Sequence, residues 1–211
     1  DKNKVISLLA RAYMITESDD DVISLSNDAA SLNSEYHNQY LAYKTIAALR
    51  THQKDIANES VKIAQSLSST NQYSFLASAY LAFSEKRTAE ANEYISQVLL
   101  INPSNADAVM LQGHVASATN DFPQAVKSYK QYYQLQPLAG VTQFFIAEAL
   151  LRNKQFDEAE KYADAILVNV SNQPFANYIK AMSRFQAKDY KNAHEHAESS
   201  LSTNFDKFEL K

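Results

Sequence analysis

Histidines and carboxylates are the side chains of this sequence that could do acid–base or metal chemistry, and their spacing argues against both. His194 and His196 lie two residues apart, so on a helix they point about 200° away from each other and cannot share a metal ion. His114 has no carboxylate three or four residues away to orient it as a general base. Glu148 lies 34 residues after His114, one period of the internal repeat described below. The sequence leaves undecided whether the two side chains form a polar contact.

The remaining signatures of catalysis and cofactor binding are missing from the sequence. The acidic run Asp19-Asp20-Asp21 lacks the glycine and the final glutamate of a calcium loop, so we interpret it as the negatively charged start of a helix near Val22. The absence of cysteine excludes disulfides, thiol catalysis and Cys-ligated metals, and two glycines are too few for most phosphate-binding loops. We therefore predict no enzyme activity, no metal and no cofactor.

Composition narrows the classes of partner and of fold. A net charge of −4 over 211 residues offers no basic surface for nucleic acid. No run of 18 apolar residues could span a bilayer, and the first residues lack the apolar stretch of a signal peptide. Few glycines and prolines disfavour an all-β fold and favour long helices joined by short links. We expect the sequence to be part of a longer chain, with any export signal outside it.

A repeat with a period of about 34 residues organises the sequence. At this spacing small residues recur in two columns, and large apolar residues recur in a third. The columns are Ala79, Gly113, Ala147 and Ala181; Ala91, Ala125, Ala159 and Ala193; and Leu99, Tyr133, Leu167 and Leu201. Only glycine or alanine fits where two helices cross closely, so each repeat is predicted to be a pair of packed helices such as 106–119 and 122–135.

Three segments carry a family resemblance: GHVASATNDFPQAVKSYKQYYQLQP (113–137), AEALLRNKQFDEAEKYADAIL (147–167) and AMSRFQAKDYKNAHEHAESSL (181–201). They resemble the tetratricopeptide repeat (TPR). The resemblance implies an all-α, TPR-like α-solenoid, a right-handed superhelix of about six antiparallel helix pairs. The family's tryptophan is absent throughout, and its preferred turn glycine is replaced by Lys86, Asn120, Lys154 and Lys188.

We assign residues 1–211 to one solenoid domain. Clear TPR units are expected at 72–105, 106–139, 140–173 and 174–207. Residues 3–71 form two degenerate helix pairs, the first of them slipped by one residue in register. Degenerate terminal repeats are typical of such arrays because they cap the stack.

Two segments suggest a narrower resemblance. PFANYIKAMSRFQAKDYKNA (174–193) and FDEAEKYADAIL (156–167) are similar to the large TPR lipoproteins associated with the exosortase and PEP-CTERM sorting system of Gram-negative bacteria. This resemblance implies a place in the cell envelope, on the periplasmic side, near protein-sorting or exopolysaccharide machinery. A cytoplasmic location is the alternative.

The resemblance also implies where a partner would bind. In TPR stacks the first helix of each pair lines the concave face, and here that face carries many aromatic and thioether side chains, which make good anchors. The candidate contacts to a partner protein or peptide are Tyr43, Tyr73, Tyr80, Asp107, Met110, His114, Phe144, Glu148, Arg152, Tyr178 and Met182. The predicted function is a non-catalytic protein–protein interaction scaffold.

Two alternatives stay open at this stage. A small roll of the first helix of the last unit would bury its aromatic stripe in the core, because Asn177, Lys180 and Arg184 occupy positions expected to face the packing interface. The roll would bury Tyr178 and Phe185, whereas an open groove would leave both exposed. The second helices form the outer face, where residues such as Glu160 should be solvated. The alternative function is a structural spacer or oligomerisation arm that self-associates through its ends and binds nothing in the groove.

Overall fold

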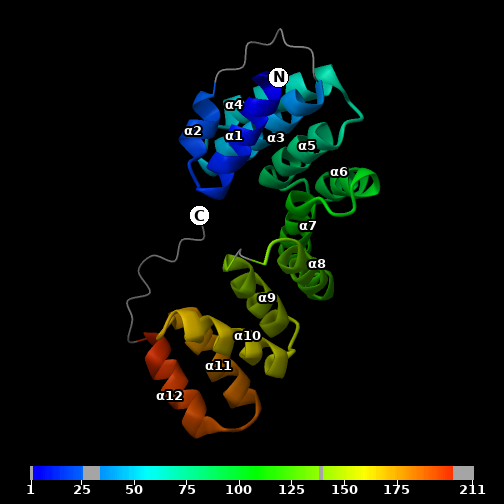
Figure 1. Ribbon diagram of the computed structural model, residues 1–211. Helices are drawn as coiled ribbons and strands as arrows, with labels where there is room; N and C mark the ends of the chain where they lie inside the picture. Colours follow the sequence, from blue (N-terminus) through cyan, green and yellow to red (C-terminus); the bar gives the residue numbers. More distant parts are fainter. Residues whose placement is uncertain (1, 26–33, 138–139, 202–211) are drawn as a thin grey trace. The chain divides into compact units, whose positions relative to one another are not determined.

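The computed structural model describes residues 2–25, 34–137 and 140–201, and these residues form twelve α-helices and no strand (Figure 1). The helices follow one another as six pairs, so the predicted all-α class and the number of pairs are confirmed. The bounds are α1 Lys2–Ile15, α2 Asp19–Ser24, α3 Ser34–Arg50, α4 Lys54–Leu67, α5 Gln72–Ser84, α6 Thr88–Ile101, α7 Ala106–Ala118, α8 Phe122–Leu135, α9 Val141–Arg152, α10 Phe156–Asn169, α11 Pro174–Gln186 and α12 Tyr190–Leu201.

The turns inside the helix pairs recur with the sequence period. Five turns, each one period after the last, hold one residue apiece with a positive φ between 60° and 62°: His52, Lys86, Asn120, Lys154 and Lys188. This is the left-handed conformation for which the family prefers glycine, as expected for the last four. Glu17, with φ 56°, precedes His52 by one residue more than the period, which confirms the one-residue slip of the first pair.

The acidic run lies inside a helix rather than ahead of one. α2 begins at Asp19, three residues before the expected start near Val22, and Asp19, Asp20 and Asp21 form its first turn. Negative charge at this end of a helix interacts favourably with the exposed N–H groups and the helix dipole. The expected electrostatic role holds, and only the boundary was wrong.

Both small-residue columns are buried, as helix crossing requires. All eight members, from Ala79 to Ala193, are buried, and Ala91, Ala125 and Ala159 have no exposed surface. The third column is less uniform: Leu99, Tyr133 and Leu167 are half-buried, whereas Leu201 is 77% exposed. Close helix packing is therefore set by the two small columns.

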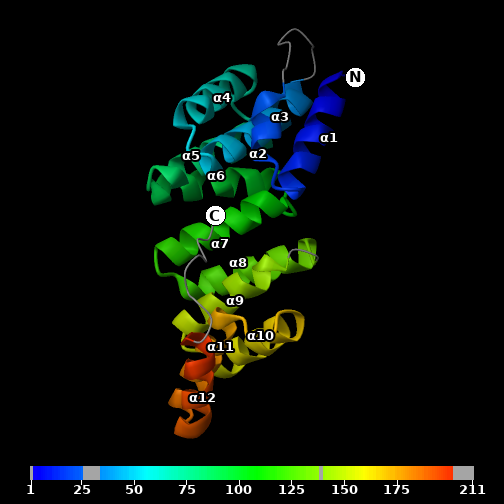
Figure 2. The same ribbon diagram turned by 90° about the vertical axis from the view of Figure 1, so that its left-hand side faces the viewer.

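The chain forms two compact units whose boundary lies inside α7, between Leu111 and Gln112. In the first unit α3 packs against α1, α2, α4 and α5, and α5 also packs against α4 and α6 (Figure 1, Figure 2). In the second unit each helix from α8 to α12 packs against the next. That residues 1–211 form one domain, that the helices wind into a superhelix, and that the repeats have the stated boundaries stay predictions.

The first unit contains two clusters of buried apolar side chains. One joins α1 to α4 and includes Ile6, Val22 and Tyr40, and the other includes Leu76 and Val98. Each cluster contains side chains from several helices, so the burial of apolar surface stabilises the packing of neighbouring helices.

Gly113 is a position where the packing excludes any side chain. A Cβ built on Gly113 would overlap Cε1 and Cδ1 of Tyr129, a residue that is only 3% exposed. We expect Gly113→Ala to lower the free energy of unfolding by about 1–2 kcal/mol, because overpacking exceeds the gain in helix propensity. Urea unfolding of the purified protein measures this change.

Gly140→Ala is the matched control, since a Cβ at Gly140 meets nothing within 4 Å. It should not destabilise the protein. In a Tyr129→Leu background the clash is relieved, so Gly113→Ala should become neutral or stabilising. An equal loss in both backgrounds would refute the assigned contact between Gly113 and Tyr129.

Candidate functional site

A groove of about 460 Å³ lies between α9 and α11 in the second unit. These two helices pack against α10 far more than against each other, which leaves room between them. The groove is lined by Glu148, Leu151, Arg152, Lys154, Phe156, Phe175, Tyr178, Met182 and Gln186. Four predicted binding residues are therefore brought together here, namely Glu148, Arg152, Tyr178 and Met182.

Stacked aromatic rings form one wall of this groove. The Phe175 ring lies between Phe144 and Tyr178, with centroids 6.4 Å apart and planes inclined by 26° in both pairs. Phe144, another predicted binding residue, extends this aromatic row. Tyr178 is 42% exposed and Phe185 is 56% exposed. For α11 the rotated-core alternative, which required both to be buried, is wrong.

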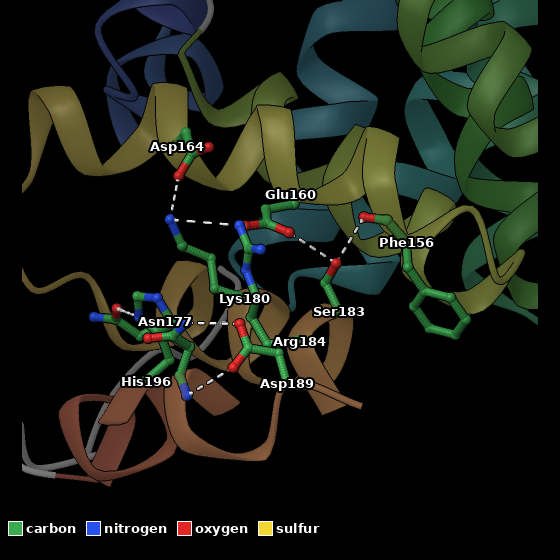
Figure 3. A network of polar contacts seen from close by, with 10 residues as sticks. Phe156, Glu160, Asp164, Asn177, Lys180, Ser183, Arg184, Asp189 and His196 are labelled. Atoms are coloured by element: carbon green, nitrogen blue, oxygen red, sulfur yellow. Dashed lines mark hydrogen bonds and ion pairs between the residues drawn. The ribbon is translucent and has the colours of Figure 1, made fainter. Parts of the chain in front are cut away.

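Cross-helix ion pairs explain why the polar side of α11 faces α10 (Figure 3). The Glu160 carboxylate accepts hydrogen bonds from the Arg184 guanidinium and from Ser183 Oγ, the latter at 2.9 Å. Lys180 Nζ lies 3.9 Å from Glu160 Oε1 and donates a hydrogen bond to Asp164 Oδ1. The Glu160 side chain is only 12% exposed, so its expected place on the solvated outer face was wrong.

Asn177 completes the polar face of α11. Asn177 is buried, and its Oδ1 lies 3.3 Å from Nδ1 of His196 on α12 (Figure 3). Burial, helped by the nearby Lys180, lowers the pKa of His196 below its usual value. With these polar groups satisfied by α10 and α12, the opposite side of α11 presents its aromatic residues outward.

Among the side chains that line the groove, cations outnumber carboxylates. Arg152 Nη2 lies 3.4 Å from Glu148 Oε1, and the Arg152 side chain is 57% exposed. The Arg152 guanidinium also lies 5.8 Å from the centroid of the Phe122 ring. Lys154 is exposed and forms no ion pair with any residue that the structure describes. Two cations thus accompany one carboxylate, which Arg152 already neutralises.

His114 lies among aromatic rings rather than beside a carboxylate. Its Nδ1 is 3.0 Å from the Tyr129 hydroxyl oxygen, and its ring meets the Phe145 ring edge-on at a centroid distance of 5.0 Å. Burial lowers the pKa of His114 to about 4 and raises the pKa of Tyr129. The contact to Glu148 that had stayed open is not formed, because Glu148 pairs with Arg152 instead.

Three predicted binding tyrosines of the first unit take part in its packing. Tyr43 is only 6% exposed and belongs to the core, so it does not offer the exposed contact that was predicted for it. Gln39 Nε2 donates to the hydroxyls of Tyr73, at 2.9 Å, and Tyr43, at 3.4 Å. Tyr80 packs against both core clusters, and its hydroxyl donates to the backbone oxygen of Asp107 at 3.3 Å. Burial raises the pKa of Tyr43 and of Tyr73.

Gln39 is a residue that the sequence analysis missed. It precedes Tyr73 by one repeat period, so the repeat register already placed the two side chains in corresponding positions of successive first helices. Asp107 and Met110 are half-buried in the first unit. Burial raises the pKa of Asp107, against the opposing effect of Arg11 and Arg50. These residues do not take part in the groove, which the second unit builds alone.

The described part of the chain contains no group of three histidine, cysteine, aspartate or glutamate side chains that could hold a metal ion. Of the helices described, none has the length and apolarity needed to cross a bilayer.

Comparison with known families agrees with this geometry. The Tetratricopeptide repeat family matches residues 76–139 and, one repeat further along, residues 110–177. The predicted family is thus supported for residues 76–177, and no enzyme family is indicated. None of the curated proteins matches the sequence significantly.

Solved structures show the same fold for most of the chain. It is similar to MamA MSR-1 with 16% identity and a TM-score of 0.66, over 78% of this chain and 95% of that one. MamA AMB-1 is 16% identical with a TM-score of 0.67, over 79% of this chain and 98% of that one. YrrB, a TPR protein described as having an unusual peptide-binding site, is 14% identical with a TM-score of 0.68. The match covers 82% of this chain and 88% of YrrB. The TPR-like α-solenoid class is therefore confirmed.

Proposed function

We propose that the protein is a non-catalytic TPR scaffold that binds a segment of a partner protein in the groove between α9 and α11. The observation that carries this proposal is the exposed aromatic wall, in which Tyr178 is 42% exposed beside Phe175 and Met182. Large apolar side chains gathered on an open surface are typical of protein-binding sites, and tyrosine is a frequent anchor. The peptide-binding site named for YrrB supports a peptide as the class of ligand.

The groove proposal is tested by capturing partners with matched variants. The bait is the wild-type protein, the Tyr178→Ala/Met182→Ala variant, or Val168→Ala as control, since Val168 is 85% exposed on α10 and does not line the groove. Circular dichroism first verifies that the three are equally helical. A partner retained by the wild type and by Val168→Ala but lost from the double variant supports the proposal. Identical captured proteins for all three baits would contradict it.

We propose further that the scaffold acts in the envelope of a Gram-negative bacterium, beside exosortase and PEP-CTERM sorting or exopolysaccharide machinery. The support is the resemblance of residues 156–167 and 174–193 to the TPR lipoproteins of that system. Fractionation of cells that produce the full-length protein tests the location. Recovery in the cytoplasmic fraction alone would contradict it and favour the cytoplasmic alternative.

A structural spacer or oligomerisation arm is the second candidate, favoured by the exposed apolar face of α1. On this helix Val5 is 55% exposed, Leu8 56% and Ile15 75%. Sedimentation at increasing concentration tests self-association. A dimer that Leu8→Ser/Ile15→Ser abolishes, together with no partner lost on changing the groove, would favour this function over the scaffold.

A further inference from the structure

The charge around the groove carries information about the partner that goes beyond an apolar contact. Glu148 is the carboxylate of the lining, and Arg152 Nη2 already lies 3.4 Å from it. Lys154, next to the end of α9, is exposed and has no ion-pair partner among the described residues. The lining thus has one cation beyond what its own carboxylate neutralises.

The size and the chemistry of the walls limit what enters. A groove of about 460 Å³ accommodates one or two large side chains, and its aromatic wall favours contact with another ring or a branched aliphatic group. The exposed rim cations remain in partial contact with water, where they favour acidic over basic partners and speed association. A carboxylate next to the apolar anchor would meet them.

We infer that the groove recognises an acidic segment with a large apolar anchor, a conclusion that rests on the proposed function and specifies its ligand. The anchor binds against Tyr178 and Met182. A glutamate or aspartate beside the anchor pairs with Arg152 and Lys154. Glu148 acts as an internal competitor, because it occupies Arg152 in the free protein.

Capped peptides labelled with fluorescein test this inference by fluorescence anisotropy. The acidic probe has a central phenylalanine between pairs of glutamates in a Gly/Ser background. The basic probe replaces each glutamate with lysine, and the anchorless probe replaces the phenylalanine with alanine. We expect the acidic probe to bind at least about tenfold more tightly than either, and to weaken as salt is added.

Variants of the rim separate charge recognition from loss of folding. Arg152→Gln/Lys154→Asn should weaken the acidic probe about tenfold, since asparagine tolerates the left-handed backbone of Lys154. Lys161→Gln/Lys191→Gln removes the same charge from exposed positions outside the groove and should leave binding unchanged. Glu148→Gln should tighten binding about threefold by releasing Arg152, a gain that misfolding cannot produce.

The outcomes distinguish this inference from the function on which it rests. Equal binding of the acidic and basic probes, or weaker binding by Glu148→Gln, overturns the inferred charge recognition. If the acidic and basic phenylalanine probes both fail to bind the Tyr178→Ala/Met182→Ala variant, the groove still binds an apolar anchor, and the proposed function stands without charge recognition. Failure of every probe to bind overturns the inference, and identical partner capture by all groove variants would overturn the scaffold function as well.

Discussion

Acidification from pH 6.5 to pH 4 is expected to lower the free energy of unfolding by about 2–3 kcal/mol through His114 alone. Burial among Tyr129 and Phe145 disfavours the charged imidazolium and lowers the pKa of His114 to about 4, against 6.5 in the unfolded chain. Between these two values the unfolded chain binds a proton that the folded protein does not. His114 therefore hardly affects the free energy of unfolding above pH 6.5, and it lowers this free energy progressively as the pH falls toward 4.

Burial also lowers the pKa values of His37 and His196, so the wild type alone does not report on His114. Comparing the wild type with a variant that lacks His114 isolates its contribution. Urea unfolding midpoints of the wild type and of His114→Gln are compared across the same pH range. The variant should lose less stability on acidification, whereas His194→Gln, which removes an exposed histidine, should follow the wild type. Parallel curves for wild type and His114→Gln would show that His114 is not held neutral by its surroundings.

The fold could be predicted from the sequence because paired helices require particular residue types at regular positions along the chain. Each close crossing admits only glycine or alanine, and each short turn needs one left-handed residue, so both recur once in every repeat. Gly113 under the Tyr129 ring and Lys86 with φ 62° are examples of these two constraints. The first helix pair deviates by one residue, and Glu17, with φ 56°, occupies the left-handed position of its turn.

The site was only partly predictable, because the same pattern of aromatic residues has different neighbours along the stack. Tyr43 and Tyr178 both lie on first helices, yet Tyr43 is 6% exposed and Tyr178 is 42% exposed. The difference is set by the residues that oppose each helix, which periodicity does not report. Glu160 shows the same limit: on its own helix it resembles a surface residue, and only the cations of α11 give it a buried role.

Glu160→Ala is expected to lower the free energy of unfolding by about 1–2 kcal/mol, less than for a fully buried ion pair because Arg184 is partly exposed. The substitution leaves Arg184 without its carboxylate and Lys180 with Asp164 alone, in an interface where the Lys180 side chain is 16% exposed. It also removes the acceptor of the Ser183 hydroxyl at 2.9 Å. The loss falls mainly on Lys180, whose charge stays largely desolvated, whereas Arg184, with a side chain that is 40% exposed, is hydrated in the variant.

Urea unfolding at neutral pH measures this loss, and Glu195→Ala is the control because Glu195 is exposed on α12. A double-mutant cycle with Arg184→Ala gives the coupling between Glu160 and Arg184. If Glu160→Ala destabilises no more than Glu195→Ala, the network contributes nothing to the packing of α10 on α11.

The same network fixes which side of α11 faces the groove, so its loss should affect orientation as well as stability. A helix with apolar residues on both sides has no strong preference for one rotation, and buried ionic contacts can select between such packings. The chain has no cysteine, so Phe185→Cys introduces a single thiol at a position that is 56% exposed. Replacing Glu160, Lys180 and Arg184 together by leucine should preserve helicity but slow the alkylation of that thiol about threefold or more, because α11 can then roll toward the packing that buries residue 185. Unchanged alkylation would mean that the groove wall is oriented by its aromatic stacking alone, and that the ion pairs only stabilise it.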